Sequence, residues 1–233
     1  MKCIIASTST LHGSSYLTYL LPKIKDFFKS PSKVLFIPYA RPGGITYDQY
    51  TQKASEAFQK IGAKVKGIHE YSNPVEAINE AKFIFTGGGN TFLLVKTLHE
   101  LNLMQALKKA ILNGTHYLGT SAGSNICGVN MKTTNDMPIV YPPSFNTLNL
   151  LNFNINPHYL DTTPNSKHMG ETREKRIIEF LHQNTIPVVG LREGSWIEVN
   201  DNEISLQGTL NARVFKSSSE IYEIKPDHSL KNL

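Results

Sequence analysis

The sequence predicts an α/β protein with a three-layer, doubly wound architecture around a mostly parallel β-sheet. Short apolar runs alternate with longer amphipathic stretches along most of the chain. The apolar runs carry hydrophobic residues at successive positions, which is typical of parallel strands buried on both faces. Hydrophobic residues make up 40% of the 233 residues and charged residues 18%, so the chain can bury a core and is not expected to be disordered.

The predicted elements alternate in type along the chain. The expected strands are residues 2–7, 33–38, 65–69, 82–86, 117–119 and 187–191. The expected helices are residues 14–28, 47–61, 74–80, 91–100, 103–112 and 171–183. We expect Pro22 to kink or split the first helix and Gly62 to end the second.

The last third of the chain changes character. Residues 196–199, 203–206 and 213–216 are expected to form short antiparallel strands joined by Asn-Asp and Gly turns, as a small C-terminal β extension. No linker or internal repeat is visible, so residues 1–233 are predicted to form a single domain, with residues 217–233 as a loosely attached tail. Residues 132–165 lack a periodic pattern and are long for a connection, which is typical of a functional loop.

Charge and hydropathy exclude several classes of protein. The chain has 24 basic and 19 acidic residues, a net charge of +5 with His neutral, and no run of five or more basic residues. Nucleic-acid binding is therefore not expected. No stretch approaches the roughly 18 consecutive apolar residues of a transmembrane helix, so no membrane partner is expected.

The cysteines and the N-terminus point to a cytoplasmic protein. Cys3 and Cys127 are the two cysteines, too far apart for a CxxC motif, and we expect both to be buried thiols in a reducing compartment. The apolar N-terminal stretch is too short for a signal peptide. No interface stripe stands out, so monomer and homodimer remain open.

The segment Gly119-Thr120-Ser121-Ala122-Gly123 has the pattern G-x-S-x-G. It follows a predicted strand directly, and Ser124 and the residues after it could open a helix. This is the setting of a nucleophile elbow, in which small neighbours allow a strained turn that exposes the serine Oγ. The backbone N–H of Ala122 would then face the carbonyl oxygen under attack. A Gly/Ser-rich turn without catalytic function is the alternative.

A second glycine-rich loop, Gly87-Gly88-Gly89, also lies between a predicted strand and a predicted helix. A dinucleotide site would require G-x-G-x-x-G, but Phe92 occupies the last position of that pattern, and no G-K-[ST] of a P-loop occurs. No cofactor is therefore expected. Together with the elbow, the loop fits as half of an oxyanion hole. A metal site is not expected either, because His69-Glu70 and His99-Glu100 lack the second histidine of H-E-x-x-H.

A serine nucleophile needs a base and a group that orients the base. His158 lies near the end of the long loop, after the apolar residues Phe153 and Ile155, and is the favoured base among the eight histidines. Two carboxylates compete as the orienting acid. Asp136 lies on the same loop as His158, whereas Glu193 follows a predicted sheet strand, where active-site residues gather in open α/β folds. A turn cap or a surface carboxylate is the alternative role for each.

These motifs together resemble peptidase E, the α-aspartyl dipeptidase family of serine peptidases. The resemblance extends from the first strand to about residue 216. It is carried by Phe85-Thr86-Gly87-Gly88-Gly89-Asn90-Thr91-Phe92, Thr120-Ser121-Ala122-Gly123-Ser124-Asn125, Thr133-Thr134-Asn135-Asp136-Met137-Pro138-Ile139-Val140, Leu148-Asn149-Leu150, Asn154-Ile155-Asn156-Pro157-His158, Gly170-Glu171-Thr172-Arg173-Glu174 and Gly190-Leu191-Arg192-Glu193-Gly194. Thr120 departs from the family, which often has a bulkier aromatic residue beside the nucleophile.

The resemblance implies a class I glutamine amidotransferase-like fold and hydrolysis of dipeptides with an N-terminal aspartate. In the motifs that match, Ser121 corresponds to the nucleophile and His158 to the general base. Asp136 corresponds to the assigned relay acid, and Glu193 to a glutamate also considered for that role. Gly89 and Ala122 match the oxyanion-hole positions.

Selection of an N-terminal aspartate requires a cation, for which Arg173 is the first choice because its guanidinium can bind a carboxylate through two hydrogen bonds. A salt-bridged residue on the first turn of its helix is the alternative for Arg173. A mild positive charge would suit an acidic dipeptide. Three other functions remain open: a cyanophycinase-like β-aspartyl peptidase, an amidotransferase, which usually needs a cysteine at the elbow, and a small-molecule-binding module without catalysis.

Overall fold

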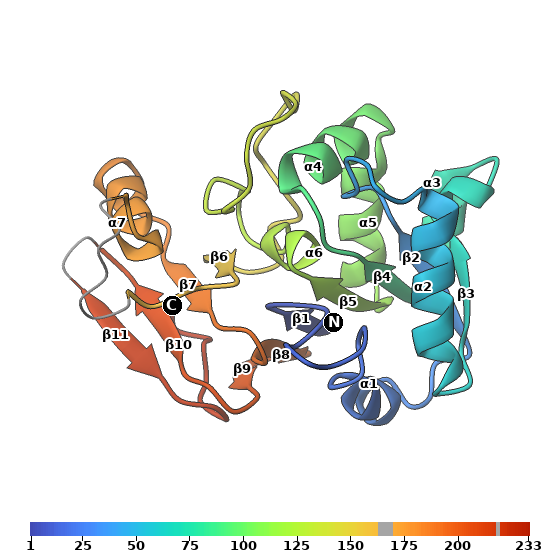
Figure 1. Cartoon of the computed structure of the whole chain (residues 1–233), viewed down its shortest axis with the longest axis horizontal. Helices are drawn as coiled ribbons and strands as arrows, with labels where there is room; N and C mark the ends of the chain where they lie inside the picture. Colours follow the sequence, from blue (N-terminus) through green and yellow to red (C-terminus); the bar gives the residue numbers. More distant parts are fainter. Residues whose placement is uncertain (163–169, 218–219) are drawn as a thin grey trace.

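A seven-stranded β-sheet forms the centre of the computed structural model, which describes residues 1–162, 170–217 and 220–233 (Figure 1). Its strands, from one edge to the other, are β3 (Lys64–Gly67), β2 (Lys33–Ile37), β4 (Phe83–Thr86), β5 (His116–Thr120), β1 (Lys2–Ala6), β8 (Trp196–Asn200) and β9 (Glu203–Gln207). The first five strands run parallel, and β8 and β9 are antiparallel to their neighbours. The prediction of a mostly parallel sheet is confirmed.

Helices cover both faces of this sheet. One face carries α1 (Leu21–Phe27) and α2 (Tyr47–Gln59), and the other carries α3 (Pro74–Glu80), α4 (Thr91–Glu100) and α5 (Leu103–Leu112). Successive strand residues point to opposite faces, so Ile4 of β1 packs on the α1–α2 side whereas its neighbours Cys3 and Ile5 pack on the other. The three-layer, doubly wound arrangement follows from these strands, which are apolar on both faces.

A four-stranded sheet lies beside the central one, on its β8–β9 side (Figure 1). Its strands, in order, are β11 (Ile221–Ile224), β10 (Ala212–Phe215), β7 (Val188–Leu191) and β6 (Asn154–Pro157). Strands β6 and β7 are parallel, and β10 is antiparallel to both of its neighbours. Helix α7 (Arg173–Gln183) covers this sheet, with Ile177 and Leu181 packed against Val188 and Phe215.

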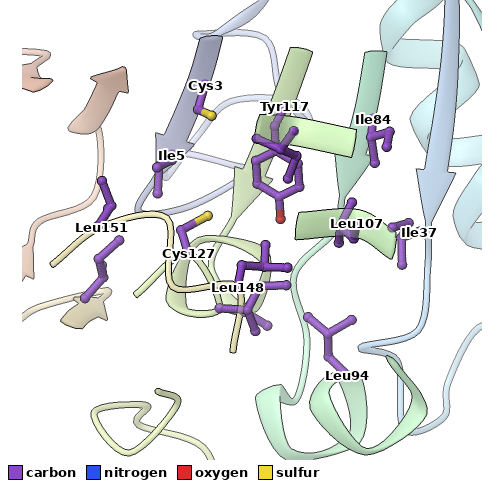
Figure 2. Close-up of a cluster of buried hydrophobic side chains, with 14 of the residues drawn as sticks. Cys3, Ile5, Ile37, Ile84, Leu94, Leu107, Tyr117, Cys127, Leu148 and Leu151 are labelled. Atoms are coloured by element: carbon purple, nitrogen blue, oxygen red, sulfur yellow. The ribbon is translucent and has the colours of Figure 1, made fainter. Parts of the chain in front are cut away.

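The long segment after Ser121 contributes to the core rather than lying wholly outside it. Figure 2 shows Cys127, Leu148 and Leu151 packed with side chains of the central sheet and of α4 and α5. Cys3 and Cys127 are both free and buried, as predicted. Burial raises the pKa of the Cys3 thiol to about 12, so it stays protonated and unreactive at neutral pH.

Most predicted elements are found, and those over 74–80, 91–100 and 103–112 have the predicted bounds. The helix expected over 14–28 begins only at Leu21, because Pro22 occupies its first turn, where a missing N–H costs no hydrogen bond. The strand expected over 65–69 ends at Gly67 and continues as the 3₁₀ turn Ile68–Glu70.

The predicted loop over 132–165 contains the strand β6, which the sequence analysis missed. Its residues, Asn154-Ile155-Asn156-Pro157, have weak strand propensity. They form a strand because the whole segment pairs with β7 from Asn154 to Pro157. The C-terminal strands were expected to form one small β extension, but they are divided between the two sheets. Strands β8 and β9 join the central sheet, and β10 joins the second sheet.

The C-terminal tail is packed on both sheets, in contrast to the loose attachment that was predicted. Strand β11 pairs with β10, and the backbone N–H groups of Asp227 and Leu230 donate to the carbonyls of Leu206 and Ile204 in β9. The side chain of Leu230 is fully buried. Backbone pairing at two sheet edges thus holds a segment whose sequence is mostly polar. No helix in the described part of the chain could cross a membrane.

The tail makes a testable contribution to stability. We expect Leu230→Ala to lower the free energy of unfolding by about 2 to 5 kcal/mol, because it deletes a fully buried side chain. Leu210→Ala is the matched control; Leu210 is 44% exposed, so its loss is expected to change stability by less than about 0.5 kcal/mol. Urea unfolding measures the free energy of unfolding of both variants. If Leu230→Ala were as stable as Leu210→Ala, the packing of the tail on the sheets would be contradicted.

Candidate active site

Ser121 lies on a strained turn between β5 and the short helix α6 (Ala122–Asn125). Its φ of 54° and ψ of −111° are unusual for a residue with a side chain. The neighbouring glycines make the turn sterically feasible: a Cβ at Gly123 would collide with the carbonyl of Thr86, and one at Gly119 with the carbonyl of Gly123. The turn therefore has the geometry, as well as the sequence pattern, that a nucleophile elbow requires.

The imidazole of His158 contacts both Ser121 and Glu193. Its Nε2 lies 2.8 Å from the Oγ of Ser121, and its Nδ1 lies 2.6 Å from an Oε of Glu193. His158 directly follows β6, and Glu193 lies two residues after β7. Because these strands are adjacent and parallel, both side chains lie at the carboxyl ends of the strands, on the same side of the second sheet. A carboxylate at Nδ1 favours the tautomer with the proton on that nitrogen, which leaves the lone pair of Nε2 facing the hydroxyl.

The backbone of His158 is held in a left-handed conformation with a φ of 53°. Its N–H donates to the Oγ of Ser7 at 2.8 Å, and its carbonyl accepts a close hydrogen bond from the guanidinium of Arg173. Ser7 is fully buried; its Oγ donates to the carbonyl of Leu191 at 2.7 Å and its N–H to the carbonyl of Ser195 at 3.1 Å. Ser7, the residue after β1, thus joins the two sheets beneath His158.

The sequence analysis missed Ser7. Its only signal is a small polar residue at the carboxyl end of the first strand, where side chains of a parallel sheet reach the active-site edge. Nothing in the sequence shows that β6 and β7 end beside it. The hydrogen bonds of Ser7 depend on that tertiary arrangement.

Asp136 lies at the start of α4 and not beside His158. Its Oδ2 accepts hydrogen bonds from the N–H of Thr91 at 2.7 Å, the Oγ1 of Thr91 at 2.6 Å and the Oγ1 of Thr134 at 2.9 Å. A carboxylate at a helix N-terminus satisfies an unpaired N–H and interacts favourably with the helix dipole. Among the described residues, the acid that contacts His158 is Glu193.

The segment around Asp136 nevertheless supports the site. The side-chain amide of Asn135 donates to the carbonyl of Pro157 at 2.7 Å, directly before His158. The amide of Asn156 donates to the Oδ1 of Asn135 at 2.9 Å and to the carbonyl of Thr133 at 2.8 Å. These bonds fasten the end of β6 to the segment that Asp136 anchors on α4.

The glycine-rich loop after β4 lies against the elbow. A Cβ at Gly88 would come within 2.9 Å of the Cβ of Ser121, so only glycine permits this approach. Gly89 has a φ of 146°, and a Cβ there would collide with the carbonyl of Ala40. The structure thus brings the two predicted halves of an oxyanion hole, the glycine loop and the elbow, next to each other.

Arg173, the first residue of α7, lies beside His158 and Glu193. In addition to the carbonyl of His158, its Nη1 lies 3.4 Å from the carbonyl of Pro157. Burial lowers the pKa of Arg173 from its usual value, and the carboxylates of Glu193 and Asp136 act in the opposite direction. The predicted cation is therefore close to the candidate catalytic residues. In the described part of the chain, no three His, Cys, Asp or Glu side chains form a group that could hold a metal ion.

Relatives of about 40% identity cover nearly the whole chain. A peptidase E of Streptomyces coelicolor is 43% identical over all of this chain and 95% of its own length. A Drosophila melanogaster protein named "Probable alpha-aspartyl dipeptidase" is 42% identical over 96% of this chain and 93% of its own. A peptidase E of Salmonella typhimurium is 39% identical over 98% of this chain and 99% of its own.

Solved structures share the fold at lower identity. A peptidase from an acI-B1 Actinobacterium superposes with a TM-score of 0.74 and 16% identity, over 98% of this chain and 96% of that one. A protein of Listeria monocytogenes EGD-e superposes with a TM-score of 0.67 and 22% identity, over 89% and 98%. The sequence model of peptidase family S51 matches residues 3–207. The resemblance to this family is thus confirmed: the chain belongs to peptidase family S51.

Proposed function

We propose that this protein is a serine dipeptidase that hydrolyses dipeptides with an N-terminal aspartate. The observation that carries the proposal is the hydrogen-bonded series from Ser121 through His158 to Glu193 on a strained elbow. Relatives of about 40% identity that carry the names peptidase E and alpha-aspartyl dipeptidase support the substrate class. The expected partner is therefore a small peptide. The cytoplasm remains the predicted compartment.

The reaction follows from the contacts of Ser121. His158 Nε2 takes the hydroxyl proton as Oγ forms a bond to the carbonyl carbon of the N-terminal aspartyl residue. The N–H groups of Gly89 and Ala122 stabilise the resulting oxyanion. The tetrahedral intermediate then collapses, the C–N bond breaks, and the protonated His158 gives its proton to the departing amine. Water, activated in turn by His158, hydrolyses the acyl-enzyme and releases aspartate.

Glu193 is proposed as the acid that orients His158. It lies 2.6 Å from Nδ1, and its negative charge stabilises the imidazolium that forms during each proton transfer. Asp136 is proposed to act indirectly, by anchoring the segment that holds the end of β6. The contacts of the two acids support this assignment.

Arg173 is proposed to supply the positive charge that selects the β-carboxylate of aspartate. A guanidinium has five N–H donors, and Arg173 contacts the carbonyls of His158 and Pro157 through Nη1. Its other nitrogens are proposed to bind the substrate. Because Arg173 also holds the backbone of His158, substrate binding and the position of the base are coupled through one side chain.

The linkage that the enzyme cleaves tests the proposed function. We expect the wild-type protein to hydrolyse Asp-Leu and not β-Asp-Arg, measured by release of free amino acids. A cyanophycinase-like peptidase would show the reverse preference. A binding module would hydrolyse neither and would be stabilised thermally by its ligand. Either of these results would contradict the proposal.

Substitution of the two acids separates their roles. We expect Glu193→Gln to lower kcat for Asp-Leu by about 10²- to 10⁴-fold with little change in stability, because it removes the charge that orients and stabilises His158. We expect Asp136→Asn to cost about 1 kcal/mol of stability through the weakened helix cap, with a loss in kcat of less than about tenfold. Steady-state kinetics and thermal unfolding measure both effects. If Asp136→Asn had the larger effect on kcat, the assignment of Glu193 would be wrong.

A further inference from the structure

Arg41 lies at the same end of the central sheet as Ser121, after the carboxyl end of its strand and close to the glycine loop. It follows β2 after Pro38, Tyr39 and Ala40. The carbonyl of Ala40 accepts a hydrogen bond from the N–H of Asn90 at 2.7 Å and lies directly against Gly89. The segment that carries Arg41 therefore packs on the proposed oxyanion-hole loop.

A series of contacts leads from Arg41 to the nucleophile. The guanidinium carbon of Arg41 lies 4.4 Å from the centre of the Tyr50 ring. The hydroxyl of Tyr50 donates to the carbonyl of Gly88 at 3.2 Å, and Gly88 lies against Ser121. Arg41 is thus separated from Ser121 by one aromatic side chain and one glycine.

Arg41 is the arginine whose charge the described residues leave without a polar partner. Each of the other four makes ion pairs or hydrogen bonds; they are Arg173, Arg176, Arg192 and Arg213. In the described ranges the side chain of Arg41 makes no ion pair or hydrogen bond, and its Nε is buried without an acceptor. A buried, unpaired guanidinium N–H is unfavourable, so an acceptor bound at this position would be stabilised.

Arg41 and Arg173 approach Ser121 from opposite sides. Strands β4 and β2 lie on one side of β5, and β1 lies on the other. Arg41 follows β2, whereas Arg173 is bonded to His158, whose N–H is bonded to Ser7 after β1. Figure 1 shows the same separation, with β2 and β4 on one side of β5 and with β6 and α7 on the other.

We infer that Arg41 binds the C-terminal carboxylate of the dipeptide substrate. This inference rests on the proposed function. An Asp-Xaa dipeptide has one carboxylate on the aspartyl side chain and one at its C-terminus, on opposite sides of the scissile carbonyl carbon. Arg173, on one side of Ser121, binds the aspartyl carboxylate. Arg41, on the other side, pairs with the C-terminal carboxylate through bidentate hydrogen bonds from its guanidinium. Such a contact favours dipeptides over longer peptides, because a third residue would replace the carboxylate with an amide.

The test compares a substrate that has a C-terminal carboxylate with one that lacks it. The substrates are Asp-Leu and Asp-p-nitroanilide, and the variants are Arg41→Ala and Arg41→Lys. We expect Arg41→Ala to lower kcat/KM for Asp-Leu by about 10- to 100-fold, mainly through KM, because a charge-assisted hydrogen bond is lost. For the anilide we expect a change of less than about threefold, and Arg41→Lys should retain part of the activity toward Asp-Leu.

Lys53→Ala is the matched control. The Nζ of Lys53 lies over the ring of Tyr16 at 5.0 Å, and the hydroxyl of Tyr16 bonds to that of Tyr50 at 3.3 Å. This variant thus removes a cation from the same aromatic cluster, and we expect it to leave both substrates unaffected.

Two results would overturn the role of Arg41: an unchanged kcat/KM of Arg41→Ala for Asp-Leu, or an equal loss for both substrates. If the wild-type protein cleaved neither substrate, the proposed function itself would fail. Thermal unfolding checks that each variant is folded. If Arg41→Ala does not fold, Arg41→Lys decides, since a selective loss for Asp-Leu alone supports the inference and an equal or absent loss contradicts it.

Discussion

The hydrogen bond between His158 and Ser121 is the contact on which the rest of the site depends. Its two residues come from different sheets, since Ser121 follows β5 of the central sheet and His158 follows β6 of the second. The 2.8 Å separation therefore requires the two sheets to be fixed relative to each other. Ser7 provides that connection, because its backbone and side chain together bond to His158, Leu191 and Ser195. The position of the second sheet is thus part of the proposed catalytic geometry.

Both residues of this hydrogen bond have an unfavourable backbone conformation. Ser121 and His158 both have positive φ values, which other parts of the structure must stabilise. At Ser121 the surrounding glycines remove steric conflict, while at His158 hydrogen bonds to the N–H and the carbonyl hold the conformation. The two means of stabilisation differ. Ser121 projects from a crowded end of the central sheet, whereas His158 follows β6, a strand whose residues have weak strand propensity. These contacts thus hold the proposed reacting groups in place in the absence of substrate.

The sequence was sufficient for local features and insufficient for those that depend on tertiary pairing. The parallel strands, most helices and the elbow at Ser121 were predictable, because apolar periodicity and glycine spacing are local signals. Strand β6 and the packed C-terminal tail were not, since backbone pairing with distant strands creates them. The choice between Asp136 and Glu193 stayed open for the same reason. In the sequence, each acid lies in a segment expected to reach the active site. Only the arrangement of β6 and β7 brings Glu193 to Nδ1 of His158.

Labelling with a serine-directed phosphonate measures the reactivity of Ser121 without assuming a substrate. We expect one covalent adduct, located at Ser121 by mass spectrometry. It should be absent in Ser121→Ala and form at least about 100-fold more slowly in His158→Ala, because the general base is lost. No adduct, an adduct at another residue, or equal labelling rates with and without His158 would contradict the proposed mechanism.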